Sequence, residues 1–213
     1  LIQVEKDKRA AEIHTIQMQI NPHYIYNTLA SIKWLIWQGD TQKTTGVIDA
    51  FIALLRNTIS NTDEFVTVEQ EIQNLKNYVL INQARYGDSV SAEFYVTPQC
   101  SSYRVPKLIL QPFVENAFFH GFADGRRGKI QVFVKEEGDC LRFEIRDDGI
   151  GIKTERLMEL KNGNASKTEQ CTGIGVGNVD QRIKLIYGED YGIHISSEEG
   201  KGTTVTLTLK KKI

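Results

Sequence analysis

The chain has 213 residues, of which 40% are hydrophobic and 25% charged, and its formal net charge at pH 7 is -1. This length and composition indicate one or two globular domains with a sizeable core. The small net charge argues against direct binding of nucleic acid or membrane surfaces through bulk positive charge. The three cysteines have no CxxC spacing, which argues against a disulfide framework or a zinc site and favours a reducing compartment.

The sequence opens at Leu1, in mid-pattern and without an initiator methionine. We therefore expect it to be a fragment of a longer protein. No apolar run approaches the length that a membrane-spanning helix needs.

Two amphipathic helices are predicted within residues 1–61. Apolar residues recur at helical spacing on both sides of the turn sequence WQGDTQ, with Asp40 or Thr41 placed to cap the second helix. Two such helices form an antiparallel hairpin. A hairpin alone leaves an apolar face uncovered, so we expect it to pair with a second copy in a four-helix bundle. The apolar positions are Ile13, Ile16, Ile20, Ile25, Leu29, Ile32 and Ile36, then Val47, Ile48, Phe51, Leu54, Leu55 and Ile59.

The remainder of the chain predicts a different architecture, and we place the boundary between residues 1–62 and 63–213. A third helix is expected at about 67–86. Beyond Val90, strands with alternating apolar residues interleave with helices, which indicates an α/β layer domain. The composition of residues 161–173 suits a mobile loop or lid. The expected strands cover 90–96, 129–135, 140–146, 191–197 and 203–209, and the expected helices cover about 106–121, 153–161 and 176–187.

A proline precedes a histidine in the stretch QINPHYIYNTL. On a helical wheel His23 lies roughly 160° from Ile25, so it points away from the apolar stripe, with Asn27 beside it. Pro22 removes a backbone N–H and bends the helix. An exposed neutral imidazole is a competent nucleophile near pH 7, although a hydrogen-bonded histidine is the commoner role. A metal site is disfavoured because His14 is nine residues away.

Two glycine motifs could contact a ligand. In RDDGIGI, the Asp147 carboxylate can accept from an exocyclic amine, and Gly149 and Gly151 let the backbone approach a flat ligand, although Asp-Asp-Gly is also an ordinary turn. In TGIGVGN, alternating glycines precede a predicted helix and can offer N–H groups to phosphates, unless the motif is merely a flexible loop. Asn178 excludes the dinucleotide fingerprint. These alternating glycines are Gly173, Gly175 and Gly177.

The helix containing LQPFVENAFFHG places Asn116 and His120 on one face. A carboxamide oxygen suits Mg²⁺, although a polar helix face is the simpler interpretation of a single asparagine. GKGTTVTL, at residues 200–207, predicts a tight turn into the last strand.

In chain order the motifs are an asparagine on a helix, Asp-x-Gly-x-Gly after a strand, alternating glycines, and Gly-x-Gly-Thr before the last strand. This succession resembles the ATP-binding fold shared by histidine kinases, DNA gyrase B, the Hsp90 chaperones and mismatch-repair ATPases. A more specific resemblance, from about Ile13 onward, is to the cytoplasmic part of LytS-type sensor histidine kinases. It rests on QMQINPHYIYNTLASI, LQPFVENAFFHGF, DDGIGI and GIGVGNVDQRIKLIYGEDYGIHISSEEGKGTTVTL. This resemblance implies an α+β fold, in which a helical hairpin, a four-helix bundle in the dimer, precedes a two-layer α/β sandwich that binds ATP.

The resemblance also implies a role for each motif. His23 would accept the γ-phosphoryl group of ATP, Asn116 would bind Mg²⁺, and Asp147 would bind the adenine amino group. Gly149 and Gly151 would line the base, Gly173, Gly175 and Gly177 would flank the phosphate lid, and Thr203 would help to hold the adenine. His120 would be a further nucleotide-binding position.

The implied protein is a homodimer that passes its phosphoryl group to an aspartate of a response regulator. It would be the cytoplasmic portion of a membrane-anchored bacterial sensor, with residues 61–67 as a hinge between its two units. Phe119 stands where relatives often carry a lysine, and Tyr24 where other histidine kinases carry an acidic residue. The general base is therefore unassigned. A nucleotide-sensing pseudokinase and a gyrase-like or Hsp90-like ATPase are the alternatives.

Overall fold

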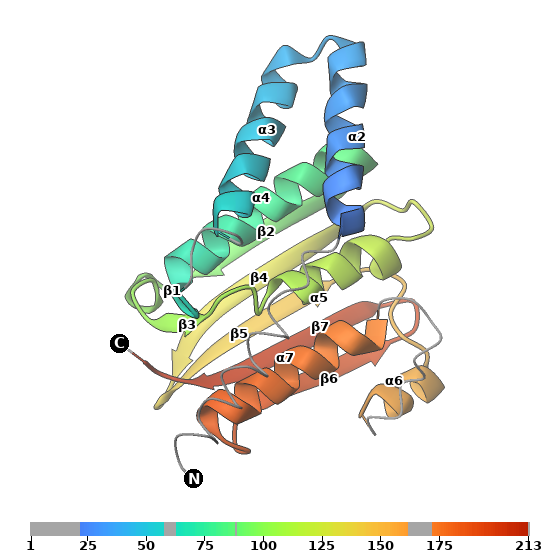
Figure 1. The fold of residues 1–213 in the computed structure, drawn as a ribbon. Helices are drawn as coiled ribbons and strands as arrows, with labels where there is room; N and C mark the ends of the chain where they lie inside the picture. Colours follow the sequence, from blue (N-terminus) through green and yellow to red (C-terminus); the bar gives the residue numbers. More distant parts are fainter. Residues whose placement is uncertain (1–21, 58–62, 88, 162–171, 213) are drawn as a thin grey trace.

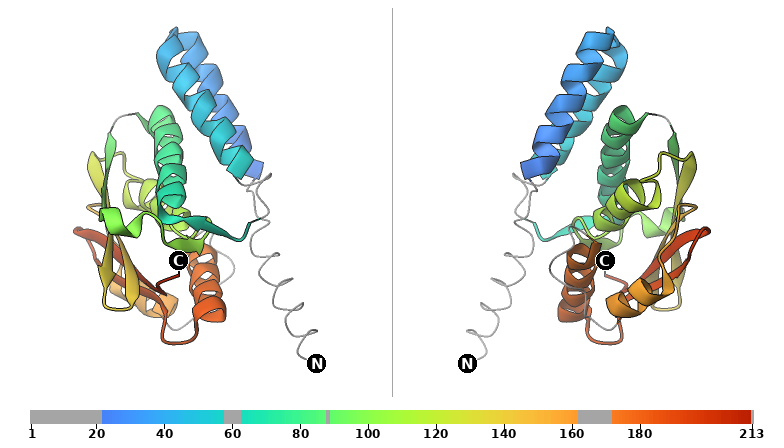
Figure 2. Two further views of the ribbon diagram at one scale, coloured as in Figure 1. Left: turned by 90° about the vertical axis from the view of Figure 1, so that its left-hand side faces the viewer. Right: turned by 90° about the vertical axis from the view of Figure 1, so that its right-hand side faces the viewer.

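The computed structural model describes residues 22–57, 63–87, 89–161 and 172–212. Figure 1 shows a helical hairpin beside a five-stranded sheet, and Figure 2 shows the helices of the second unit on one face of that sheet. This is the predicted α+β arrangement of a hairpin and a two-layer α/β sandwich. Within the ranges given above, no helix is both long enough and apolar enough to cross a bilayer.

Helices α2 (Pro22–Gln38) and α3 (Thr41–Leu55) form the predicted hairpin. The turn between them requires a glycine, because Gly39 has a left-handed φ of +74°. Asp40 then caps α3, as its side chain accepts a hydrogen bond from Lys43 N at 2.9 Å.

Only part of the apolar stripe predicted on the first helix is covered in the structure. Ile25 and Ile32 pack partly against the core, whereas Leu29 is 49% exposed and Ile36 60% exposed. On α3, Ile52 is likewise 49% exposed. The hairpin therefore presents apolar surface that the described part of the chain does not cover. Other large apolar side chains exposed on it are Tyr26, Trp34, Trp37 and Ile48.

Helix α4 (Val68–Tyr86) lies between the hairpin and the sheet and agrees with the helix predicted at 67–86. It begins with a capping box, in which the Thr67 hydroxyl accepts from Gln70 N and the Gln70 side chain accepts from Thr67 N. These two bonds give α4 a defined start directly after the linker from the hairpin.

The linker between the hairpin and the sandwich pairs with a strand of the sandwich. Strand β1 (Phe65–Thr67) pairs antiparallel with β3 (Arg104–Pro106). The hinge predicted at residues 61–67 is therefore too long, because residues 65–67 belong to this strand pair. Residues 61 and 62 lie outside the described residues.

The main sheet contains the five predicted strands in the order β2-β4-β5-β7-β6. Strands β2 and β4 are parallel, and the other neighbouring pairs are antiparallel. The core lies between the sheet and helices α4, α5 (Gln111–Asn116) and α7 (Thr172–Tyr187), with Ile130, Phe143 and Leu207 all 0% exposed. The strands are β2 (Val90–Val96), β4 (Gly128–Glu137), β5 (Cys140–Asp147), β6 (Gly192–Glu198) and β7 (Gly202–Lys210).

The helix predicted at 106–121 begins later than expected. It consists of α5 (Gln111–Asn116) and a π-helical segment, η3 (Ala117–Gly121). Pro106 instead ends β3, and Leu108 has a left-handed φ of +61°, which an α-helix excludes.

The helix predicted at 176–187 begins four residues earlier, since α7 spans Thr172–Tyr187. The glycine motif was predicted to precede the helix. It lies instead within the first turns of α7. Helix α6 (Thr154–Lys161) agrees with the prediction at 153–161. Most of the predicted lid, residues 162–171, lies outside the described residues.

Candidate nucleotide-binding site

A cavity of about 110 Å³ lies between the sheet and the helices α5, η3 and α7. Its wall is mainly apolar, with a few polar groups, as is usual for sites that bind flat heterocyclic ligands. Five residues singled out in the sequence line it, namely Asn116, His120, Asp147, Gly151 and Thr203. The other lining residues are Phe113, Ala117, Gly121, Ile145, Ile150, Ile152, Val176, Ile195 and Val205.

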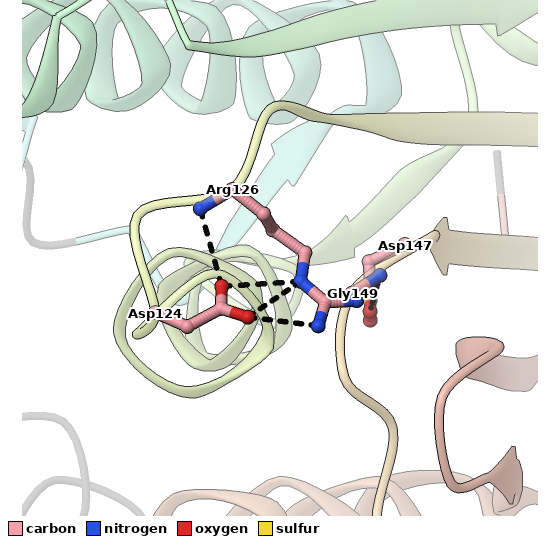
Figure 3. Close-up of polar contacts among 4 residues, drawn as sticks. All are labelled: Asp124, Arg126, Asp147 and Gly149. Carbon is pink, nitrogen blue, oxygen red and sulfur yellow. Dashed lines mark hydrogen bonds and ion pairs between the residues drawn. The ribbon is translucent and has the colours of Figure 1, made fainter.

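Asp147 ends β5 at the cavity and is anchored by its neighbours. Its Oδ1 accepts a hydrogen bond from Gly149 N at 3.0 Å (Figure 3), and the Thr203 N–H also bonds to the carboxylate. Burial raises the pKa of Asp147, while these two N–H donors act in the opposite direction. A carboxylate has about four acceptor positions, so it retains capacity for a ligand donor.

The loop after Asp147 needs glycine because the backbone passes close to other segments. A Cβ on Gly149 would lie 2.4 Å from the Gly121 carbonyl oxygen, and one on Gly151 would lie 2.1 Å from the Glu198 carbonyl oxygen. Ile150 N donates to the same Gly121 oxygen at 2.9 Å. This packing fixes the loop against η3 and forms one wall of the cavity, which Gly151 lines and Gly149 supports from behind.

Thr203 lies opposite Asp147 in the β5–β7 ladder. Ser197 holds it in place, because the two hydroxyl oxygens are 2.9 Å apart. Ser197 Oγ also donates to the Gly202 oxygen at 2.9 Å and accepts from Ile152 N at 2.8 Å. The Ser197 hydroxyl therefore connects β6, β7 and the glycine loop at the rim of the cavity.

Asn116 and His120 reach the same cavity from the end of α5 and from η3. Within the described part of the chain, the Asn116 carboxamide makes no hydrogen bond of its own. Burial lowers the pKa of His120, so its imidazole is neutral near pH 7. Burial also raises the pKa of the neighbouring Glu115.

The chemistry of this donor set fits Mg²⁺ only when it is bound together with a nucleotide. The described residues contain no group of three or more His, Cys, Asp or Glu side chains that could hold a metal ion. Mg²⁺ commonly takes one or two protein oxygens and completes its shell with phosphate oxygens and water. The carboxamide of Asn116, which has no hydrogen-bond partner among the described residues, can supply one such oxygen.

The start of α7 borders the cavity, since Val176 lines it. Gly177 lies instead on a second, open hollow of about 620 Å³, together with Asp180 and Lys184, which form an ion pair at 2.7 Å. Gly173 and Gly175 belong to the first turns of α7. Their surroundings lie outside the described residues.

His23 lies at the start of the described part of α2. Its side chain lies outside the described residues, as do residues 1–21, which the predicted bend at Pro22 involves. The outward orientation of His23 therefore stays a prediction.

Two kinds of site residue were missed in the sequence. The first is Ser197, which the alternation of the β6 stretch YGIHISS places on the same face as Ile195. The second is the apolar wall, whose strand residues Ile145, Ile195 and Val205 follow the same alternation. Periodicity could have found both, but only once the cavity face of the sheet was known.

Comparison with protein families extends these observations. Residues 11–90 match the family described as histidine kinase, and residues 103–213, more than half of the chain, match the histidine kinase-, DNA gyrase B-, and HSP90-like ATPase family. The catalytic domain of histidine kinase ThkA has a similar fold, with a TM-score of 0.54 and 19% identity over 70% of this chain and 95% of that one. The histidine kinase domain of the blue-light activated kinase EL346 of Erythrobacter litoralis gives a TM-score of 0.50 and 16% identity over 95% of each chain.

Curated relatives cover nearly all of the chain. Sensor histidine kinase YesM of Bacillus subtilis is 31% identical over 94% of this chain and 33% of its own length. Sensor protein LytS of Bacillus anthracis is 29% identical over 95% of this chain and 34% of its own length. Sensor histidine kinase BtsS of Escherichia coli is 28% identical over 93% of this chain and 33% of its own length. This chain spans about a third of the length of these relatives. It belongs to the histidine kinase-, DNA gyrase B- and HSP90-like ATPase family and, within it, to the LytS-type sensor histidine kinases.

Proposed function

We propose that the chain is the kinase part of a two-component sensor, which transfers the γ-phosphoryl group of ATP to His23 and then to an aspartate of a separate response regulator. The observation that carries the proposal is the cavity in which Asn116, Asp147 and Thr203 meet from three different elements. The relatives named above support it, because they are sensor histidine kinases that match over nearly the whole chain.

In this proposal the adenine ring occupies the apolar cavity. Asp147 accepts a hydrogen bond from its amino group, Thr203 helps to hold the ring, and Gly151 lets the backbone lie close to it. His120 lines the same wall as a neutral imidazole. The start of α7, with Gly173 and Gly175 in its first turn, would offer free N–H groups and a positive helix end to the phosphates. Gly177 lies further along α7, where its N–H is already used within the helix.

Asn116 would bind Mg²⁺ through its carboxamide oxygen. When bound, Mg²⁺ neutralises part of the charge on the phosphates. The protein then has to place the γ-phosphorus in line with a nitrogen of the His23 imidazole, which is nucleophilic when neutral. Because His23 lies on the hairpin and the nucleotide in the sandwich, the two units have to move relative to one another before transfer.

We further propose that residues 1–62 and 63–213 act as two units, and that the hairpin pairs with a second copy. The exposed Leu29, Ile36 and Ile52 support this pairing, because they leave apolar surface on both helices. In the full-length sensor, a membrane-anchored region would precede this cytoplasmic portion.

An Ile52→Glu variant is expected to be monomeric where the unaltered chain is dimeric. Burying one isoleucine is worth about 1.5–3 kcal/mol, and a dimer would lose two such contacts and gain two buried charges. Light scattering coupled to size-exclusion chromatography measures the change. Gln42→Glu, an exposed polar position on the same helix, is the control. Dimers of unchanged stability in the Ile52→Glu variant would contradict pairing through this face.

Nucleotide affinity is expected to fall as the pH is lowered, beginning at a higher pH than for an ordinary aspartate with a pKa of about 3.9. The reason is that burial raises the pKa of Asp147, and its ionised form accepts from the adenine amino group more strongly than the protonated form does. The ligand binds the ionised form, so binding is fully present above the pKa and weakens by up to about tenfold per pH unit below it. Titration calorimetry with ADP at a series of pH values measures this. If the affinity of the Asp147→Asn variant for ADP falls with pH in the same way, Asp147 is not the group responsible.

Incubation with γ-labelled ATP and Mg²⁺ tests the proposed function directly. A phosphohistidine is labile in acid and stable in alkali, so the expected result is protein-bound label with this behaviour. The alternative of a nucleotide-sensing pseudokinase, which Phe119 favours in the sequence, predicts nucleotide binding without label. A gyrase-like or Hsp90-like ATPase predicts release of phosphate without label.

A further inference from the structure

The turn at residues 107–110, directly before α5, is held from α4 by a buried carboxylate. Glu71 is only 2% exposed, and it accepts hydrogen bonds from Leu108 N at 2.8 Å and Leu110 N at 3.1 Å. Among the described non-glycine residues, Leu108 alone has a positive φ, at +61°. A residue in this conformation stays in it only where its surroundings hold it there. Glu71 supplies that support from a position far away in the chain.

The same turn is held from α7 by a buried guanidinium. Arg182 is 5% exposed, and its Nη1 donates to the Lys107 carbonyl oxygen at 2.8 Å. Its Nε and Nη2 are buried without a hydrogen-bond partner in the described part of the chain. A buried group that satisfies only part of its donors is unusual, and such groups tend to be kept for what they position.

The linker from the hairpin contacts this turn as well. Lys107 N donates to the Glu64 carbonyl oxygen at 3.1 Å, which extends the pairing of β1 with β3 by one bond. Helix α4, which carries Glu71, also bonds to the hairpin, because the Asn57 side chain donates to that of Asn74. The turn is therefore where segments from the hairpin linker, α4 and α7 meet.

The helical segment that follows the turn is anchored independently at its other end. Gly121, the last residue of η3, accepts a hydrogen bond from Ile150 N in the loop after Asp147. Asn116 lies between these two anchors, six residues after Leu110 and five residues before Gly121. Loosening the turn would therefore displace Asn116 while the adenine end of the segment stays attached to its loop.

We propose that Glu71 and Arg182 are positioning residues, which fix the turn at 107–110 and thereby place Asn116 for Mg²⁺ bound to the nucleotide phosphates. This inference rests on the proposed function.

The test compares ADP affinity with and without Mg²⁺ in Glu71→Gln and in Arg182→Lys. Glu71→Gln directs an NH₂ group at a backbone N–H, and Arg182→Lys removes the guanidinium donor while keeping the charge. Mg²⁺ raises the affinity of the unaltered chain for ADP by some factor, and in each variant this factor is expected to be about tenfold smaller. The reason is that a buried donor or acceptor is left unpaired. Affinity for ADP without Mg²⁺ is expected to change by less than about threefold, since the adenine anchor is intact.

The matched control is Glu69→Gln, an exposed acidic position in the first turn of the same helix. It is expected to leave both affinities unchanged. Equal losses with and without Mg²⁺, or no loss in either variant, would overturn the inference. If one variant does not fold, the other decides, because the two residues hold the turn through separate hydrogen bonds from different helices. An unaltered chain that binds no ADP at all would instead refute the proposed function.

Discussion

A His23→Gln variant is expected to lose all acid-labile, alkali-stable label after incubation with γ-labelled ATP, while it binds ADP as tightly as the unaltered chain. A glutamine carboxamide is not nucleophilic, so no phosphoryl group can be transferred to it. The nucleotide cavity lies in the sandwich and includes no residue of α2. Autoradiography and calorimetry on the same preparation therefore separate loss of the acceptor from loss of the donor site.

The matched control for this variant is His194→Gln. His194 lies exposed on β6 and does not line the cavity, so its replacement is expected to leave labelling unchanged. Label that survives in His23→Gln with the same chemical stability would mean that another residue accepts the phosphoryl group. That result would contradict the role proposed for the hairpin.

An Asp147→Asn variant is expected to bind ADP about a hundredfold more weakly and to show no label. The asparagine keeps the size of the side chain but turns part of its acceptor capacity into an NH₂ donor. That donor would face either the adenine amino group or the N–H groups of Gly149 and Thr203. A site that hydrogen-bonds a polar group of its ligand loses much affinity when one partner no longer matches, because buried polar groups are then left unpaired. Calorimetry with ADP measures the affinity.

Asp139→Asn, in the turn between β4 and β5 at the far end of β5 from Asp147, is the control. It is expected to retain both affinity and label. An Asp147→Asn variant with unchanged affinity would show that the adenine is held elsewhere, and the cavity between η3 and β7 would then need another occupant.

Much of this fold is predictable because its signals are local. The turn at Gly39, the cap at Asp40 and the five alternating strands each depend on residues within a few positions of one another. The residues that line the cavity around Asp147 and Thr203 also fall in short motifs. For this reason Asn116, Asp147 and Thr203 could be identified before their mutual position was known.

The late start of the helix before Asn116 could not be predicted in this way. The stretch from Pro106 onward has helical spacing, but Leu108 is held in a left-handed conformation by Glu71, which is 37 residues away. No pattern within the stretch reveals that contact. The same holds for Arg182, whose hydrogen bond to Lys107 spans 75 residues.

The apolar stripe on the first helix shows a second limit. Periodicity treats Ile25, Leu29, Ile32 and Ile36 alike, but the structure covers only Ile25 and Ile32 in part. Spacing reports that a side chain favours burial and not whether its own chain or a second copy covers it. The glycine motif was also placed wrongly by its local pattern. Glycines usually end a helix, but the residues from Gly173 onward belong to α7.

Mass-spectrometric localisation of the phosphoryl group, on peptides kept at neutral or alkaline pH, is the most direct test of the account. After incubation with ATP and Mg²⁺, we expect one phosphoryl group on the imidazole of His23 and none in the Asp147→Asn variant. A phosphoryl group on any other residue, or an unmodified chain that nevertheless binds ADP, would contradict it.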